Sequence, residues 1–406
     1  MHLNLYQKIL VGNQLQKNLK TYIGTLQRVD KIIMKIGIDI SQIAYKGTGV
    51  SRFTEGLVHA ILDNNKLDEW TFFFSSFRNS LELPLKEKIA AHHHTLVILP
   101  LPPTALSLLS NDLRFATRMI TNNLHQFTEL DWFITSDWIE LPMPIKKATI
   151  VHDLVFKKYP QTVHKTILRA QMTRFKYLTN ESKIIFTDSQ ATTNDLRQEY
   201  NIDSSRTVIN YPGVEVTKLR SNAQQIDHLE KFDITKPYIL SVGKQEPRKN
   251  IQKLITVFQK MAKPTQSLQL IIVGPEGWNM PDEKSNDAIK FIGYVSGEEL
   301  ATLYANALCF AYPSIYEGFG YPIIEAMKYG CPVATSNTSS IPEVAGDAAV
   351  FFDPHSEQSI QSVLEQLTGS EKLRAELVEK GLLQAQKFTW KSYYNTLITS
   401  LNEKTS

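Results

Sequence analysis

The sequence predicts an α/β protein with two domains, each built around a doubly wound parallel β-sheet. From Met34 onward, short apolar segments of the buried-strand kind alternate with helical segments, which is the pattern of a parallel sheet. A second series of the same kind begins near Lys236. With 406 residues, of which 42% are hydrophobic, the chain is long enough for each domain to bury its own core.

The leader, residues 1–33, differs in charge from the rest of the chain. It carries a net charge of +4, whereas the remainder carries −1, so the total of +3 gives no indication of nucleic-acid binding. It has neither a continuous apolar core nor a small-residue cleavage site, and it does not look like a secretory signal. We expect that the leader is not native and that Met34 is the natural start. The alternative is an amphipathic leader that touches a membrane.

The first domain is expected over residues 34–213. Its opening strand, 35–40, leads into a flexible Gly-rich loop and then into a helix with four apolar side chains on one face. The loop residues are Gly47, Thr48 and Gly49, and the helix residues are Phe53, Leu57, Val58 and Ile61. An ordinary tight turn would have the same loop composition. Further strands are expected at 70–74, 95–99, 132–136, 148–152 and 183–188.

Two features of this domain suggest ligand contact. His152 stands at the carboxyl end of its strand, the edge where doubly wound sheets bind ligands, although a histidine that only caps the strand is the alternative. The helix over 165–176 carries four basic residues that form either a solvated face or a surface for an anionic acceptor or lipid headgroups. These residues are Lys165, Arg169, Arg174 and Lys176. The apolar stretch 95–109 contains three prolines and is too short to span a bilayer.

The second domain is expected over residues 214–384, with strands at 237–243, 268–275, 291–295, 307–312 and 331–335. Arg248 and Lys249 stand where a helix begins and can neutralise a diphosphate, although two adjacent basic residues on a loop are often only solvated. Cys309 and Cys331 lie in apolar strand-like segments, so we expect buried thiols rather than a disulfide or a metal site.

The segment from Glu317 to Glu325 is the most informative in the chain. It places two carboxylates eight positions apart across a glycine-bounded turn that leads into a helix with proline near its start. Gly318 and Gly320 allow close backbone approach, and the amides at the helix start favour an anion such as a diphosphate. Glu325 can accept hydrogen bonds from a ribose diol and Glu317 from sugar hydroxyls. Two solvated glutamates near a turn are the alternative.

Several of these segments together resemble one known family. The segments 151–154, 241–250, 312–325 and 336–349 are similar to the retaining nucleotide-sugar glycosyltransferases of family GT4. The resemblance covers about residues 35–395 and implies the GT-B fold, in which two Rossmann-like domains face each other across a cleft. It also implies that 385–406, with Phe388, Trp390, Tyr393 and Tyr394, packs back on the N-terminal domain. One departure is Asn210–Val214, where many relatives have Asn-Gly at the domain junction.

The resemblance assigns roles to particular residues. It implies that His152 and Glu317 lie at the reaction centre and that Gly47, Thr48 and Gly49 face the donor and acceptor. It implies that same-face attack by the acceptor uses the leaving phosphate as base. The nucleobase would lie near Ile292 and Tyr294. The full set expected to bind the donor is Gly243, Arg248, Lys249, Ile292, Tyr294, Gly318, Phe319, Gly320, Tyr321 and Glu325.

We expect neither a metal nor a cofactor besides the nucleotide-sugar substrate. No Asp-x-Asp motif occurs in the chain. Arg248, Lys249 and the helix amides after Gly320 can instead stabilise the charge that develops on a leaving diphosphate. The expected location is the cytoplasm, with peripheral contact at the inner membrane where lipid-linked acceptors lie.

The donor is expected from the same resemblance. Segments 151–156 and 336–349 look most like the bacterial mannosyltransferase branch, so GDP-mannose is the first choice, with a glycan or lipid-linked acceptor in cell-surface polysaccharide or lipopolysaccharide synthesis. A UDP-sugar-dependent transferase (glucose, GlcNAc or galactose) is the alternative. A GT-B sugar-nucleotide epimerase and a non-catalytic binding protein are further alternatives. The epimerase would act on the donor alone, without an acceptor.

Overall fold

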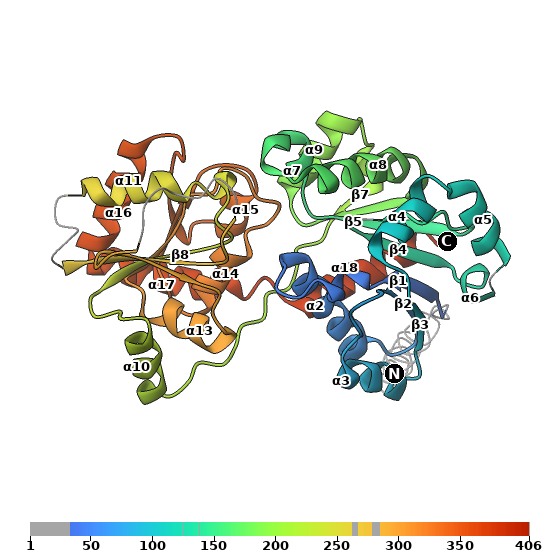
Figure 1. Ribbon diagram of the computed structural model, residues 1–406, viewed down its shortest axis with the longest axis horizontal. Helices are drawn as coiled ribbons and strands as arrows, with labels where there is room; N and C mark the ends of the chain where they lie inside the picture. Colours follow the sequence, from blue (N-terminus) through green and yellow to red (C-terminus); the bar gives the residue numbers. More distant parts are fainter. Residues whose placement is uncertain (1–32, 124, 138, 262–266, 278–284, 406) are drawn as a thin grey trace, which may run out of the picture.

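The structure is a computed structural model that describes residues 33–405 apart from 124, 138, 262–266 and 278–284. Figure 1 shows two α/β domains side by side, each with helices around a central sheet. Both sheets are entirely parallel, so the two-domain α/β fold predicted from the sequence is confirmed. The expectations about the leader concern residues that, except for Ile33, lie outside the described part of the chain.

The N-terminal domain contains a seven-stranded sheet with the order β3-β2-β1-β4-β5-β6-β7. The order reverses next to β1, as expected of a doubly wound sheet. Its strands are β1 Lys35–Asp39, β2 Glu69–Ser75, β3 Thr95–Leu99, β4 Trp132–Ser136, β5 Lys146–Val151, β6 Ile184–Thr187 and β7 Thr207–Ile209. Its helices are α2 Gly49–Asn64, α3 Leu83–Ala91, α4 Pro103–Asn111, α5 Arg114–Asn123, α6 His125–Thr128, α7 Val155–Lys158, α8 Lys165–Glu181 and α9 Gln190–Tyr200, with short 3₁₀ turns at 41–44, 160–162 and 204–206.

The C-terminal domain contains a six-stranded sheet with the order β10-β9-β8-β11-β12-β13. Its strands are β8 Tyr238–Val242, β9 Gln269–Val273, β10 Ile289–Gly293, β11 Cys309–Tyr312, β12 Val333–Ser336 and β13 Ala349–Phe352. The helices are α10 Asn222–Lys231, α11 Ile251–Lys260, α13 Gly297–Asn306, α14 Tyr321–Lys328, α15 Ile341–Ala345, α16 Glu357–Gly369 and α17 Glu371–Ala385, with a 3₁₀ turn at Pro247–Lys249. Cys309 and Cys331 are buried free thiols, as predicted.

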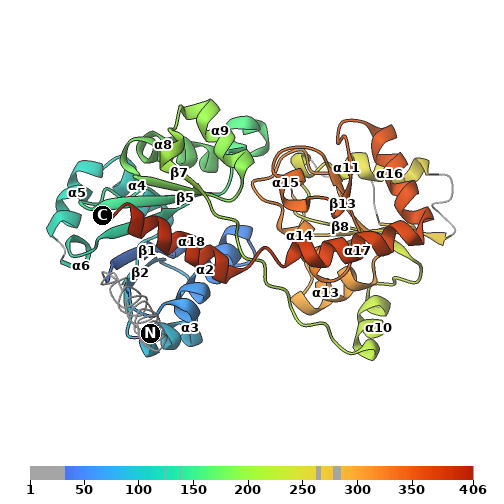
Figure 2. The same cartoon turned by 180° about the vertical axis from the view of Figure 1, so that it is seen from behind.

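The last helix, α18 Trp390–Glu403, leaves the C-terminal domain and packs on the N-terminal one (Figure 2). It lies against α2 and contributes six buried side chains to the core around β1 and β2. These are Trp390, Tyr393, Tyr394, Leu397, Ile398 and Leu401. Phe388 differs from the sequence expectation, because it packs in the C-terminal core against Phe319 and not on the first domain. The chain therefore crosses between the domains just after Phe388.

One expectation about the surface is wrong. Arg174 is not part of an exposed basic face of α8, because its side chain is only 2% exposed. Its guanidinium donates to the backbone oxygens of Asp137 and Ile150 and to the hydroxyl of Thr149, at 2.9, 2.7 and 2.7 Å. It thus fixes the ends of β4 and β5, whereas Lys165, Arg169 and Lys176 are exposed.

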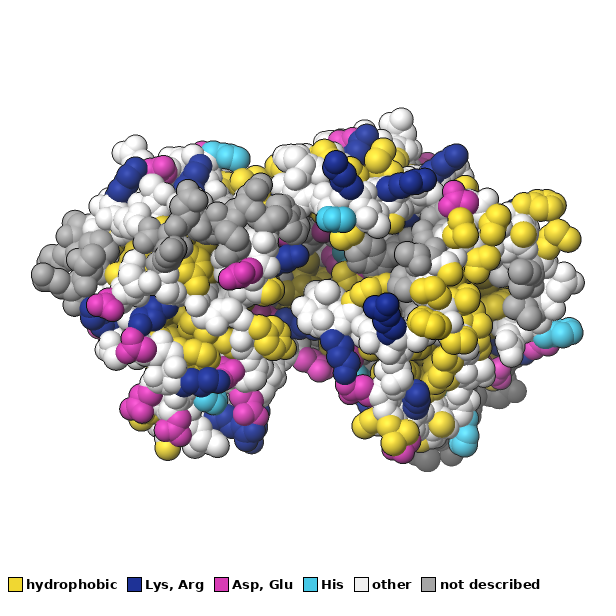
Figure 3. All heavy atoms as spheres, in the orientation of Figure 1, with side chains coloured by type: hydrophobic (Ala, Val, Ile, Leu, Met, Phe, Trp, Pro, Cys, Tyr) yellow, Lys and Arg dark blue, Asp and Glu magenta, His cyan; other side chains and the backbone are white. Residues whose placement is uncertain are grey.

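Exposed apolar side chains gather on one face of the N-terminal domain, over the region of β3, α4 and α5 (Figure 3). Phe115 is 81% exposed, and four neighbours in this region are about half exposed: Ile98, Leu108, Leu113 and Met119. In the part of the chain that the structure describes, no helix has the length and apolar character needed to cross a bilayer.

Candidate active site

The turn between β11 and α14 comes from the second domain and meets the first. After the buried strand β11, the chain turns at Gly320, whose φ of +103° is a left-handed conformation that favours glycine. Pro322 then lies in the first turn of α14. Gly318 packs against the backbone carbonyl oxygen of His152, where an added Cβ would approach that oxygen to 2.0 Å. This contact brings the predicted turn and the predicted histidine together from the two domains.

Glu317 is held by a dense set of donors from its own domain. Its carboxylate lies 2.6 Å from Lys249 Nζ and 3.0 Å from Arg248 Nη1, and it accepts hydrogen bonds from Tyr312 and Ser314. Burial alone would raise the pKa of Glu317, but the charges of Arg248 and Lys249 outweigh it and lower that pKa to about 2. Glu317 is therefore an anion with a fixed position, rather than a solvated side chain.

Arg248 and Lys249 are not solvated either. Arg248 also pairs with Glu246 at 2.6 Å, and Lys249 Nζ lies 2.8 Å from the hydroxyl of Tyr312. Burial opposes the charge of Arg248, but the carboxylates of Glu317 and Glu246 outweigh burial and raise the pKa of Arg248. For Lys249 burial is the larger effect, so its pKa is lowered although Glu317 lies beside it. Two basic and two acidic groups thus form one compact cluster beside the turn that leads into α14. Arg248, Lys249 and Glu317 were each predicted from the sequence to lie near a ligand, but neither the part played by Glu246 nor the pairing of the four groups was predicted.

Glu325 contacts the other domain. One carboxylate oxygen accepts a hydrogen bond from the hydroxyl of Tyr304, at 3.2 Å, and the other pairs with Arg52 of α2. Only 4% of the Glu325 side chain is exposed, compared with 54% of the Arg52 side chain. Sequence reasoning missed both partners. The sequence contained one relevant signal, since Arg52 follows the Gly47–Gly49 loop by three residues.

His152 lies just beyond β5 and is surrounded by groups from neighbouring strand ends. Its Nδ1 lies 2.7 Å from Asp188, which follows β6, and its Nε2 lies 3.9 Å from Asp137, which follows β4. The ring of Phe53 packs edge-on against it, with centroids 4.4 Å apart. Burial alone would lower the pKa of His152, but the two aspartates raise it to about 9. The ring is therefore an imidazolium at neutral pH.

Asp137 and Asp188 were not predicted as site residues. The signal that could have found them is their position directly after strands adjacent to β5, because the carboxyl ends of parallel strands meet at one edge. Asp137 is buried and has a left-handed φ of +57°, uncommon for a residue other than glycine. Within the described residues, one carboxylate oxygen of each aspartate has no hydrogen-bond partner.

The other predicted residues are less closely grouped. Gly243 lies next to the Lys249 side chain, where an added Cβ would be 3.6 Å from it, and thus belongs to the ion-pair cluster. Thr48 caps the start of α2, in an exposed loop with Gly47 and Gly49. Phe319 packs in the C-terminal core, so only its backbone can meet a ligand. Ile292 and Tyr294 lie at the end of β10, two strands from β8, and Tyr294 is 79% exposed.

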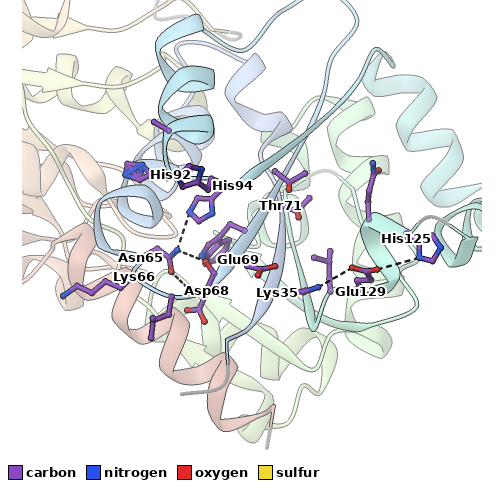
Figure 4. A pocket seen from close by; sticks show the side chains of 17 residues that line it. Lys35, Asn65, Lys66, Asp68, Glu69, Thr71, His92, His94, His125 and Glu129 are labelled. Carbon is purple, nitrogen blue, oxygen red and sulfur yellow. Dashed lines mark hydrogen bonds and ion pairs between the residues drawn. The ribbon is translucent and has the colours of Figure 1, made fainter. Parts of the chain in front are cut away.

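Two pockets lie outside this cluster. One of about 720 Å³ (Figure 4) is lined by residues at the amino ends of strands, such as Lys35, Glu69 and Thr95, together with His92 and His94. It is therefore at the opposite edge of the sheet from His152 and contains none of the predicted site residues. The other, of about 370 Å³, lies between the domains beside Tyr316 and Ser339. Among the described residues, no group of three or more His, Cys, Asp or Glu side chains is placed to hold a metal.

Comparison with known proteins shows which family the C-terminal domain resembles. Residues 224–384 match the family model of glycosyl transferases group 1. The O-antigen chain mannosyltransferase B of Escherichia coli is 29% identical over 380 residues, which cover 88% of this chain and 97% of that protein. The O-antigen chain mannosyltransferase RfbU of Salmonella typhimurium is 28% identical, over 61% of this chain and 73% of that protein.

Solved structures support the fold. Sucrose-phosphate synthase of Thermosynechococcus elongatus superposes with a TM-score of 0.68 at 16% identity, over 90% of this chain and all of that one. WaaG, a glycosyltransferase involved in lipopolysaccharide biosynthesis, superposes with a TM-score of 0.65 at 14% identity, over 89% and 99% of the two chains. The chain is therefore a glycosyltransferase with the GT-B fold, and its C-terminal domain belongs to the group 1 glycosyl transferases.

Proposed function

We propose that this enzyme transfers mannose from GDP-mannose to a glycan or lipid-linked acceptor in the synthesis of a cell-surface polysaccharide, with retention of configuration. Two relatives named as O-antigen chain mannosyltransferases support the sugar and the pathway, and the first matches over nearly its whole length. The observation that carries the proposal for the site is the contact of Gly318 with His152. It joins the turn that is proposed to bind the diphosphate, in one domain, to a charged histidine of the other.

The charges of the site suit the separation of a sugar from a diphosphate. Negative charge develops on the leaving diphosphate, and Arg248, Lys249 and the amides at the start of α14 are the groups proposed to stabilise it. Positive charge develops on the sugar ring, for which Glu317 supplies a fixed anion. A donor phosphate would compete with Glu317 for the two basic residues, so the ion-pair cluster is expected to rearrange on binding. This scheme needs no divalent metal.

His152 has a different proposed role from that of a general base. Because its pKa is raised to about 9, it carries a proton at neutral pH and donates hydrogen bonds. We assign it to a sugar hydroxyl at the reaction centre, with Asp188 fixing the orientation of the ring. The leaving phosphate is then the base that accepts the proton of the attacking acceptor hydroxyl.

The nucleotide is proposed to lie along the C-terminal domain. Glu325 would bind the ribose diol, and the end of β10, with Ile292 and Tyr294, would lie beside the base. The proximity of Glu325 to the start of α14 supports this order, since it lies four residues after Tyr321, or about 6 Å along the helix axis. That spacing is suitable for a ribose and the diphosphate attached to it.

The acceptor side of the enzyme is proposed to rest on an anionic membrane surface. The exposed apolar face of α4 and α5 adjoins α8, because Arg114 of α5 packs over the ring of Tyr177 and pairs with Glu181. Helix α8 itself carries three exposed basic residues, Lys165, Arg169 and Lys176. Apolar and cationic side chains together are the chemistry that binds anionic lipids.

A donor screen tests the proposed function. Calorimetric titration should show binding of GDP-mannose in preference to UDP-glucose and other UDP-sugars, and mass spectrometry should then show a hexose added to a lipid-linked glycan. Preference for a UDP-sugar would contradict GDP-mannose as the donor but would leave the proposed transfer reaction standing. Conversion of the donor without any acceptor product would identify an epimerase or hydrolase and contradict the transferase proposal.

A further inference from the structure

The pairing of Arg52 with Glu325 has a consequence for donor binding. Arg52 belongs to α2 of the N-terminal domain and reaches Glu325 in α14 of the C-terminal domain. The Glu325 carboxylate is otherwise enclosed by its own domain, with Tyr304 on its second oxygen. A ribose diol binds a carboxylate best by donating to both oxygens. It would therefore compete with Arg52 for the oxygen that the guanidinium holds.

The guanidinium also lies near the start of α14. Besides pairing with Glu325, the guanidinium interacts electrostatically with the hydroxyl of Tyr321, the first residue of that helix. In the described part of the chain, this buried hydroxyl has no hydrogen-bond partner. An anion bound at the start of α14 would thus lie only about one helical turn from Glu325, within reach of a guanidinium displaced from that carboxylate.

We propose that Arg52 is a further donor-binding residue, which yields Glu325 to the ribose of the nucleotide and then binds its diphosphate. This inference rests on the proposed nucleotide-sugar site and adds a ligand from the opposite domain. Arginine suits the second contact because its planar fork donates two hydrogen bonds to a phosphate. Since 54% of the Arg52 side chain is exposed, it is free to turn while the buried Glu325 stays in place. Arg52 therefore couples nucleotide binding to the approach of the two domains.

The proposal makes opposite predictions for two ligands. A nucleoside without phosphate meets only the competition at Glu325, so loss of Arg52 should strengthen its binding by about threefold, the contribution expected of a half-exposed ion pair. A nucleoside diphosphate gains from the same change at Glu325 but loses a charge-assisted contact, which is worth roughly tenfold or more. The affinity for the nucleoside diphosphate divided by the affinity for the nucleoside should consequently fall by at least roughly tenfold when Arg52 is removed.

Calorimetric titration with guanosine and GDP measures this ratio for the full chain. The variants are Arg52→Ala, Arg52→Lys and, as a matched control, Arg78→Ala, which removes an exposed arginine of the same domain. Arg52→Ala should bind guanosine more tightly and GDP more weakly than the wild type. Arg52→Lys should recover part of the preference for GDP, because it keeps the charge, and Arg78→Ala should behave as the wild type.

The outcomes separate this proposal from the proposed function. If the wild type binds GDP and the ratio is unchanged in Arg52→Ala, Arg52 is only a link between domains and the proposal is wrong. Equal weakening of guanosine and GDP would also contradict it, because that pattern indicates general damage to the site. If only uridine and UDP bind the wild type, the affinity ratio is measured with these two ligands instead. A fall of that ratio in Arg52→Ala would then support the role of Arg52, whereas GDP-mannose would be rejected as the donor. A wild type that binds no nucleotide overturns both proposals.

Discussion

Gly318 of the second domain packs against the backbone carbonyl oxygen of His152 in the first, where an added Cβ would lie only 2.0 Å from that oxygen. The same Cβ would come within 2.9 Å of the side chain of Asp153. Only glycine permits this approach, because any side chain there must push the two segments apart. The distance between the Glu317 turn and His152 is therefore set by the lack of a side chain at position 318.

Substituting Gly318 tests whether this contact is needed for catalysis. Gly318→Ala should leave both domain cores intact but separate the two halves of the site, and a displacement of about 1 Å can reduce turnover by roughly 100-fold. Circular dichroism should remain that of the wild type, and guanosine, which is proposed to lie along the second domain, should bind no more weakly. The control is Gly369→Ala, where the added Cβ meets no atom within 4 Å. Wild-type turnover in Gly318→Ala would show that the contact is incidental.

Glu317 should be important for stability as well as for turnover. Glu317→Ala leaves Arg248 and Lys249 nearly buried without their shared partner, and breaking a buried ion pair costs about 3–5 kcal/mol. Urea unfolding should therefore show a lower midpoint. Glu317→Gln keeps the hydrogen-bonding shape and should be destabilised less, yet lose turnover by roughly tenfold or more because the anion beside the sugar is gone. Equal stability of Glu317→Ala and wild type would contradict the ion-pair cluster.

The charge of His152 should make stability depend on pH. Its pKa is raised from 6.5 to about 9 in the folded protein, so its charge stabilises the fold fully below pH 6.5, and this contribution is lost as the pH rises through about 9. The difference between these two pKa values corresponds to a contribution of roughly 3 kcal/mol to the free energy of unfolding. The melting temperature of the wild type should fall across this interval.

The matched variant is Asp188→Asn, which removes the carboxylate 2.7 Å from Nδ1. The pKa of His152 should then be lower, so the decline in melting temperature should begin at lower pH and be smaller. Because other groups also titrate, the difference between the two proteins is the quantity to compare. Parallel curves for wild type and Asp188→Asn would contradict a charged His152.

Membrane contact predicts binding to vesicles that carry anionic lipids. Sedimentation with phosphatidylglycerol vesicles should retain the protein at low salt and release it at higher salt, because exposed charges are screened over about 8–10 Å at physiological ionic strength. Phe115→Ser should weaken binding, whereas Leu383→Ser, a half-exposed apolar residue of the second domain, should not. No difference between these two variants would exclude the α4–α5 face as the contact.

Most of the fold could be predicted because buried parallel strands appear in the sequence as short apolar segments. The strands β3 and β4 have the predicted bounds. The strands β7 and β13 were missed, the first because it has only three half-buried residues and the second because it lies at the end of a segment interpreted as a motif. β10 begins two residues earlier than predicted, at Ile289, because the polar Lys290 interrupts the apolar pattern.

The candidate site could be predicted as residues but not as contacts. Glu317, Arg248 and Lys249 were each singled out from the sequence, yet their pairing depends on how the loop after β8 packs against the loop after β11. Arg52 was missed because its partner Glu325 lies 273 positions away in the other domain. Such contacts depend on the packing of two domains, which local sequence patterns do not encode.

The most direct test of the proposed mechanism is hexose transfer from GDP-mannose to a lipid-linked glycan in the presence of EDTA, followed by mass spectrometry and by determination of the anomeric configuration. The wild type should add a hexose to the acceptor with retained configuration and without added metal, and Glu317→Gln should be slower by roughly tenfold or more while still binding GDP. Transfer that occurs only with Mn²⁺ or Mg²⁺, an inverted product, or a Glu317→Gln variant with full turnover would contradict this account of the site.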